Sequence, residues 1–167
     1  AALAYATALR VIGPEESDGV TALRARATAA CEKWAKAVLA LKPAAYWRLN
    51  EFTGPVAADA SAPAHDAVYE RDVAYYLEGP KSASFCAGEV NRAPHLVGAR
   101  IRSRLAGLGN RYSVSLWLWN GMPNDGRATA GWIFSRDQNN ALGSSGDHLG
   151  IGGTATEPGK LIFQHGG

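Results

Sequence analysis

Three arginines, Arg100, Arg102 and Arg104, alternate with uncharged residues in the middle of the chain. In an extended strand, alternate side chains share one face, so these guanidinium groups would stand ~7 Å apart. No Asp or Glu occurs between Val90 and Arg111. Because guanidinium groups pair well with carboxylate and sulfate, the stripe predicts a site for a carboxylated or sulfated polysaccharide. The alternative is a solvated strand edge whose charges discourage strand-to-strand aggregation.

The histidines and the common catalytic motifs do not predict an active site. The sequence lacks a Gly-x-Ser-x-Gly nucleophile turn, a His-Glu-x-x-His zinc motif and a glycine-rich phosphate loop followed by a helix. Asp147 precedes a histidine, but no nucleophile accompanies the pair, and we interpret it as part of a turn. The four histidines are scattered, and we expect surface or structural roles for His65, His95, His148 and His165.

Composition limits the class of protein. With 17 Lys+Arg and 15 Asp+Glu the net charge is +2, which excludes nucleic-acid binding through bulk charge. Hydrophobic residues at 47% and charged residues at 19% are typical of a globular chain. No run of 18 apolar residues occurs, so we expect no membrane span. Residues 1–12 lack a basic region, so we expect no intact signal peptide.

The chain changes structural class near residue 43. Fifteen of its 31 alanines but two of its 19 glycines fall in residues 1–45, while residues 98–167 hold fourteen glycines. Residues 1–42 therefore predict an α-helical connector of two helices broken at Gly13-Pro14 and ended by Pro43. Trp34 and Leu41 belong to an apolar stripe on the second helix, and we expect it to pack on the first helix or the following strands.

Residues 43–167 show short apolar segments separated by turn signals, which favour an antiparallel β-sandwich or barrel. Residues 112–119 are apolar on both faces toward their end, as in a central strand covered on both sides. The predicted strands are Ala45–Leu49, Ala67–Tyr69, Ser82–Cys86, Ala99–Leu105, Tyr112–Trp119, Gly131–Ser135, His148–Ile151 and Lys160–Gln164.

The opening of this β region resembles a known family. Residues 43–51 read Pro-Ala-Ala-Tyr-Trp-Arg-Leu-Asn-Glu, followed by Gly54, by Ala-Asp-Ala-Ser at 58–61 and by His65-Asp66. This succession resembles the first strand, turn and loop of bacterial laminin-G-like domains, which are concanavalin A-type jelly rolls. Ala62 and Ala67 stand where that family prefers glycine. Three later segments resemble further strands of the family: residues 112–118, 132–136 and 159–163.

The resemblance implies that residues 43–167 are the N-terminal part of a jelly-roll β-sandwich. The closing strands of such a domain are absent from the sequence, so the remainder would come from a longer chain or from another subunit. The implied function is a non-catalytic carbohydrate- or protein-recognition module of a larger exported bacterial protein, periplasmic or extracellular. Two alternatives stay open. One is a structural or assembly domain that packs against a partner enzyme. The other is a divergent glycoside hydrolase or lyase whose catalytic residues lie outside this chain.

Glucan-cleaving enzymes of the same broad fold carry acids spaced as Glu-x-Asp-x-x-Glu or Glu-x-Asp-x-Glu on one strand. This spacing places carboxylates on one face, where one serves as nucleophile and another as acid. The nearest segment here is Glu70-Arg71-Asp72, and it lacks the third carboxylate. The sequence therefore predicts that the chain itself is not an enzyme.

Calcium is the cofactor that the resemblance implies, because such jelly rolls often hold one Ca²⁺ on loop oxygens. Asp137, Asn139 and Asp147 are the candidate ligands. Ca²⁺ takes six to eight oxygen ligands, and no twelve-residue loop pattern assembles them. Ordinary turn roles are the alternative. The further oxygen donors considered are Glu51, Asp59, Asp66, Asp125 and Asn140.

The two cysteines, Cys31 and Cys86, are 55 residues apart. In an exported protein they could form a disulfide that ties the helical segment to the sandwich, worth ~4 kcal/mol in the chain-entropy model. Two isolated buried thiols fit the sequence equally well.

Overall fold

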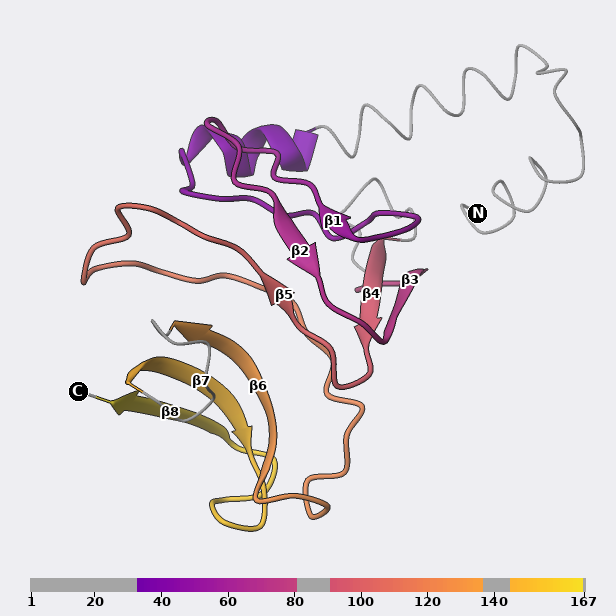
Figure 1. Ribbon diagram of the computed structural model, residues 1–167, viewed down its shortest axis with the longest axis vertical. Coiled ribbons are helices and arrows are strands. Elements are labelled where there is room, and N and C mark those ends of the chain that lie inside the picture. Colours follow the sequence, from indigo (N-terminus) through magenta and orange to yellow (C-terminus); the bar gives the residue numbers. More distant parts are fainter. Residues whose placement is uncertain (1–32, 81–90, 137–144, 167) are drawn as a thin grey trace, which may run out of the picture. The chain divides into compact units, whose positions relative to one another are not determined.

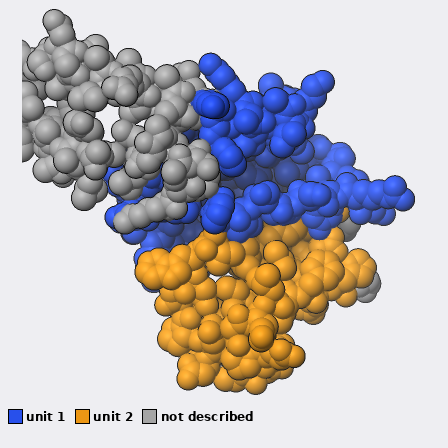
Figure 2. Space-filling model, turned by 180° about the vertical axis from the view of Figure 1, so that it is seen from behind, with its two compact units in different colours: residues 1–117 blue, residues 118–167 orange. Residues whose placement is uncertain are grey.

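The computed structural model of the chain describes residues 33–80, 91–136 and 145–166 (Figure 1). These residues are mainly β, their strands pair antiparallel, and residues 33–40 form the one short helix among them. None of the described residues forms a helix with the length and apolar character that a membrane crossing requires. The chain divides into two compact units, residues 1–117 and 118–167 (Figure 2). The predicted mainly β, antiparallel class is confirmed, and the jelly roll stays a prediction.

The helix ends just before Pro43. The amides of Leu41 and Lys42 donate to the carbonyls of Val38 and Leu39, both at 3.0 Å, and close the last turn. Lys42 has a φ of +51°, the left-handed conformation in which many helices end. Leu41 is 82% exposed, so the described strands do not cover this end of the apolar stripe, and its expected packing on the first helix stays a prediction. The rest of the predicted helical connector, residues 1–32, lies outside the described residues.

A three-stranded sheet in the first unit has the order β1-β2-β5 (Figure 1). Its strands are β1 (Val56–Ala57), β2 (Ala67–Tyr69) and β5 (Ile101–Arg102). The pleat of β2 buries Ala67 and Tyr69 and leaves Val68 51% exposed. The prediction of β2 is confirmed to the residue, whereas the strand predicted at Ala99–Leu105 shortens to β5.

A two-stranded sheet, absent from the prediction, joins β3 (Val73–Glu78) to β4 (Arg92–Leu96). The register shifts between Ala74 and Leu77, which marks a bulge in β3. The bulge leaves Tyr76 with a φ of +59°. Pro94 is compatible with β4 because β3 is the only neighbour of this strand among the described residues.

The core of the first unit is small. It is built on Ala57, Ala67 and Tyr69, and the ring of Tyr75 meets that of Tyr69 edge to face at 5.1 Å. A side chain at Gly54 would collide with Tyr75, so this turn requires a glycine. Partly buried side chains complete the core: Trp47, Leu49, Val73, Tyr75 and Ile101.

The second unit contains a sheet in which consecutive strands are neighbours, in the order β6-β7-β8 (Figure 1). The strands are β6 (Thr129–Arg136), β7 (Gly146–Gly152) and β8 (Leu161–Gly166). They contain the segments predicted at Gly131–Ser135 and His148–Ile151, and most of Lys160–Gln164. Asp147 and His148 lie within β7, so the interpretation of this pair as a turn is wrong. His148 is fully buried, with its ring 5.5 Å from that of Trp132.

Two predicted strands do not form as such. Residues 112–119 pair with none of the strands that the structure describes, and Trp117 and Trp119 are 72% and 95% exposed, so the prediction of a covered central strand is wrong. Apolar alternation makes a segment suitable for a sheet, but a strand also needs a neighbour, and none of the described strands supplies one. The segment predicted at Ala45–Leu49 makes a single bridge, between Trp47 and Asp59. The segment predicted at Ser82–Cys86 lies outside the described residues.

Candidate functional site

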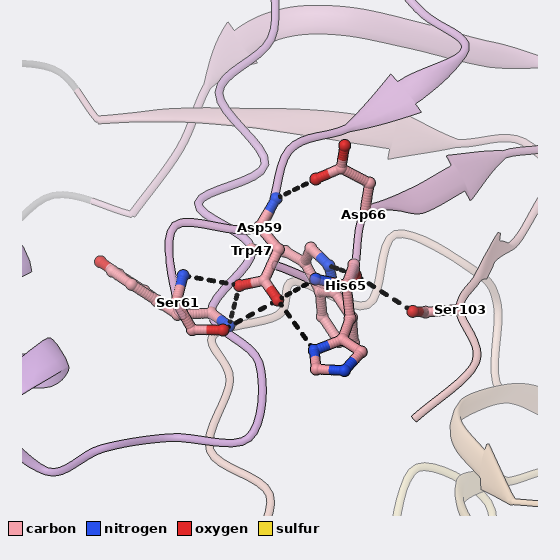
Figure 3. A network of polar contacts seen from close by, with 7 residues as sticks. Trp47, Asp59, Ser61, His65, Asp66 and Ser103 are labelled. Carbon is pink, nitrogen blue, oxygen red and sulfur yellow. Dashed lines mark hydrogen bonds and ion pairs between the residues drawn. The ribbon is translucent and has the colours of Figure 1, made fainter. Parts of the chain in front are cut away.

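The loop that carries the family-like residues is organised around the carboxylate of Asp59, whose side chain is fully buried (Figure 3). Its Oδ1 accepts hydrogen bonds from the amides of Tyr46 and Ser61, both at 2.8 Å. Its Oδ2 accepts from the Ser61 hydroxyl at 2.9 Å and from the His65 amide at 2.8 Å. Four donors therefore occupy both oxygens, which leaves Asp59 unsuited to bind a cation.

Opposing effects act on the pKa of Asp59. Burial raises the pKa, because it disfavours the charged form. The amides of Tyr46, Ser61 and His65 and the Ser61 hydroxyl stabilise the carboxylate and outweigh burial, so the pKa falls to about 2. Asp59 is thus ionised in the folded protein at neutral pH and acts as a fixed acceptor.

The neighbours of Asp59 extend this network to β2 and to the segment after β5 (Figure 3). The amide of Asp59 donates to Asp66 Oδ1 at 2.9 Å. The carbonyl of His65 accepts from the Trp47 indole at 3.0 Å and from the Ser103 hydroxyl at 3.2 Å. The network joins four segments of the chain by hydrogen bonds, so we assign it a structural role.

A cavity of about 430 Å³ lies beside this loop. His65 and Arg111 are the lining residues with ionisable side chains, and the rest of the lining is Pro, Ala, Leu and Gly. His65 Nδ1 stands 3.8 Å from Asp59 Oδ2, beyond hydrogen-bond distance. The lining contains no Ser, Thr, Cys, Lys, Asp or Glu side chain to act as a nucleophile beside the histidine.

The arginine stripe meets a carboxylate that spacing alone did not reveal. Arg100 Nε lies 2.6 Å from Glu70 Oε2, and Arg102 Nη2 lies 2.9 Å from Glu70 Oε1. All three side chains are substantially exposed, at 47%, 43% and 36% for Arg100, Arg102 and Glu70. The hydrogen bond from Arg100 lowers the pKa of Glu70, and the charges of Arg100, Arg102 and Arg71 add to this effect.

The register of the sheet explains this arrangement. Val68 lies opposite Arg102, and the Glu70 amide donates to the Arg100 carbonyl at 2.9 Å. Val68, Glu70 and the two arginines therefore share the outer face, while Tyr69 and Ile101 face the core. Exposure keeps alternating beyond β5, where Arg104 is exposed between two partly buried residues. We call Arg100, Arg102, Arg104 and Glu70 the arginine face.

The segment nearest to the glucanase acid spacing, Glu70-Arg71-Asp72, does not assemble a catalytic pair in the described part of the chain. Glu70 is held by two guanidinium groups. Asp72 is exposed, has a φ of +65° and accepts the Val97 amide through its carbonyl. Glu51, another carboxylate of this unit, accepts the Ala58 amide at 2.9 Å and the Tyr69 hydroxyl at 2.7 Å. Burial and the hydrogen bond to Glu51 raise the pKa of Tyr69.

Of the three proposed calcium ligands, Asp147 alone belongs to the described residues, so their assembly into a site stays a prediction. Asp137 and Asn139 lie outside them, and Asp147 Oδ1 is 2.7 Å from His165 Nδ1 across β7 and β8. No group of three His, Cys, Asp or Glu side chains within residues 33–80, 91–136 and 145–166 could hold a metal ion. Cys31 and Cys86, the candidate disulfide, also lie outside the described residues.

No protein-family model, curated protein or solved structure matches this chain. The geometry of the arginine face and of the Asp59 loop is therefore the basis for a functional proposal. Sequence reasoning missed the role of Glu70 on the arginine face. The available signal was that Glu70 is the first acid after the predicted strand Ala67–Tyr69.

Proposed function

We propose that residues 43–167 belong to a laminin-G-like, non-catalytic recognition module of an exported protein, and that the arginine face binds an acidic polysaccharide. The charge of this face carries the proposal. Arg100, Arg102 and Arg104 supply three positive charges and Glu70 one negative charge, an excess of 3 − 1 = +2 on an exposed surface.

The surroundings of the arginine face support an extended partner. Val56 and Val68 are 46% and 51% exposed and lie in one row of the sheet with Arg102. Glu70 holds two of the guanidinium groups in place, which lowers the entropy lost when an anion replaces water around them. A flat face of aliphatic side chains and oriented cations suits a polymer that offers both sugar carbons and carboxylate or sulfate groups.

Charge reversal tests this proposal. Arg102→Glu with Arg104→Glu should abolish retention on an immobilised sulfated polysaccharide such as heparin and remove its salt dependence. The matched control, Arg127→Glu with Lys160→Glu, makes the same change in net charge at exposed positions of the second unit. We expect the control to stay close to the wild type, with unfolding curves confirming that both variants fold. Equal retention of the two double variants would refute the role of the arginine face.

One observation favours assembly as a second candidate function. Val114 and Leu116, in the first unit, are 45% and 44% exposed on a segment that no described strand pairs with. Such a surface is suited to a strand from a partner, which would cover the apolar side chains. In sedimentation velocity, Leu116→Glu should then release the protein from a complex that the wild type forms. A wild type that sediments as a monomer at all concentrations and binds no partner would count against assembly.

A further inference from the structure

A second surface feature of the first unit joins two exposed aromatic rings to an arginine. Phe52 follows Glu51 in the loop before β1, Tyr76 belongs to β3, and Arg92 begins β4. The rings of Phe52 and Tyr76 lie 5.3 Å apart at an interplanar angle of 63°. The two residues are 72% and 41% exposed. We call these three residues the aromatic cluster.

Tyr76 lies on the exposed side of β3, at the bulge. Tyr75 packs its ring on Tyr69 in the core, and the next residue, Tyr76, points to the opposite face of the strand. The φ of +59° is unusual for a bulky residue, and such conformations cluster at binding sites and other functional positions. The backbone therefore takes an unfavourable conformation that keeps an aromatic ring at the surface.

Arg92 gives the cluster a positive charge. Its Cζ lies 4.5 Å from the centre of the Tyr76 ring, and its Nη1 donates to the Tyr76 carbonyl at 3.4 Å. Glu78 is its partner in the register, yet no carboxylate within the described residues forms an ion pair with Arg92. The guanidinium group is thus oriented by a ring and a carbonyl and retains donors for an external anion.

We propose that the aromatic cluster binds a uronic acid residue of a polysaccharide. The apolar C–H face of the pyranose ring would lie on Phe52, and its carboxylate would accept hydrogen bonds from Arg92. Aromatic side chains with a few placed polar groups are typical of small-ligand sites, and a guanidinium group matches a carboxylate in geometry. This inference rests on the proposed function, and it names the sugar that an acidic polysaccharide would offer at a second site.

Titration with two anionic probes tests the inference. The first probe is a hexamer of galacturonic acid, and the second is inorganic polyphosphate of similar charge, which has no sugar ring. Phe52→Ala should weaken binding of the hexamer about tenfold, a plausible size for one lost ring contact, and leave polyphosphate binding unchanged. Phe163→Ala is the matched control, because Phe163 is 68% exposed on the second unit. Arg92→Gln should reduce the preference for the galacturonic acid hexamer over a neutral galactose hexamer, and the arginine face should account for the preference that remains.

The outcomes separate this inference from the proposed function. If Phe52→Ala changes the affinity for both probes equally, or for neither, the proposal of a uronic acid site is wrong. This result would not depend on the binding properties of the arginine face. If Arg102→Glu with Arg104→Glu leaves binding of both probes intact, the proposed function is wrong. A selective loss of the hexamer with Phe52→Ala, beside a loss of both probes on charge reversal, supports both. Because Phe52 is exposed, we expect Phe52→Ala to fold like the wild type, and its unfolding curve tests this expectation.

Discussion

Asp59 and Glu70 are carboxylates of the same unit, and each has polar partners at both oxygens, but their surroundings differ. The Asp59 side chain is fully buried, and three of its four donors are backbone amides. The Glu70 side chain is 36% exposed, and its donors are two exposed guanidinium groups. The first carboxylate is held by the chain, whereas the second is held by side chains that water also reaches.

The difference between the two carboxylates indicates which charged groups serve the fold and which remain available to a ligand. Amides that point at a buried acceptor cannot turn to water when that acceptor is lost, so they remain unsatisfied. Guanidinium groups on the surface can be resolvated at little cost, and exposed ion pairs contribute little to stability. Substitutions at the two positions should therefore have opposite signatures, a loss of stability at Asp59 and a change of binding at Glu70.

Asp59→Ala should give the largest effect on stability. The substitution leaves the amides of Tyr46, Ser61 and His65 without their acceptor, and we expect a loss of about 3 kcal/mol or more in the free energy of unfolding. Urea unfolding followed by circular dichroism measures this loss. Asp125→Ala is the control, because Asp125 is an exposed turn residue. Equal urea midpoints of unfolding for the two variants would contradict a structural role for Asp59.

The pKa of Asp59 predicts how stability depends on pH. The folded pKa of about 2 lies below 3.8, the ordinary value for an aspartate, so the ionised carboxylate stabilises the folded state. This contribution, about 2 kcal/mol, is fully present above the unfolded pKa and is lost as the pH falls from about 4 to 2. A carboxyl NMR titration of the wild type should place the inflection of Asp59 near pH 2. An inflection near 4 would mean that the four hydrogen bonds do not hold in solution.

Tyr69→Phe tests a contact that lies between these two environments. Tyr69 is 3% exposed, and its hydroxyl donates to Glu51 Oε2 at 2.7 Å. The phenylalanine ring keeps the packing on Tyr75 and loses the hydrogen bond, so we expect about 1 kcal/mol of destabilisation in urea. Tyr76→Phe, at an exposed tyrosine, should leave the midpoint unchanged. A larger effect at Tyr76 than at Tyr69 would reverse the distinction between buried and exposed polar groups.

The sequence predicted the strands whose apolar pattern has period two and whose neighbours lie nearby. β2 matched its prediction, and β7 and β8 lie at or close to their predicted positions, because turn signals bound them. β3 was missed because the bulge between Ala74 and Leu77 interrupts its alternation of buried and exposed residues, and β4 because Pro94 interrupts it. Residues 112–119 show the converse, since their alternation specifies faces but not a partner strand.

The candidate site consists of contacts between residues that lie far apart in the sequence, and the spacing of residues along the chain does not predict such contacts. Arg100 and Glu70 are 30 residues apart, and their contact requires the register between β2 and β5. The Asp59 loop resembled a family motif, yet the amide of Tyr46 reaches Asp59 only because a bridge joins Trp47 to Asp59. Local residue types thus indicated the chemistry, and long-range register decided which groups meet.

Glu70→Gln should have the smallest effect on stability and still change binding. Removing this carboxylate raises the excess charge of the arginine face from two to three and releases Arg100 and Arg102 from their shared acceptor. We expect an unchanged urea midpoint and elution from a sulfated polysaccharide at higher salt, because more cationic charge then faces the polymer. Glu157→Gln makes the same change in net charge at an exposed position of the second unit. If both variants shift elution equally, bulk charge governs retention, and the arginine face has no special part in it. A drop in midpoint as large as that of Asp59→Ala would instead place Glu70 among the groups that hold the fold.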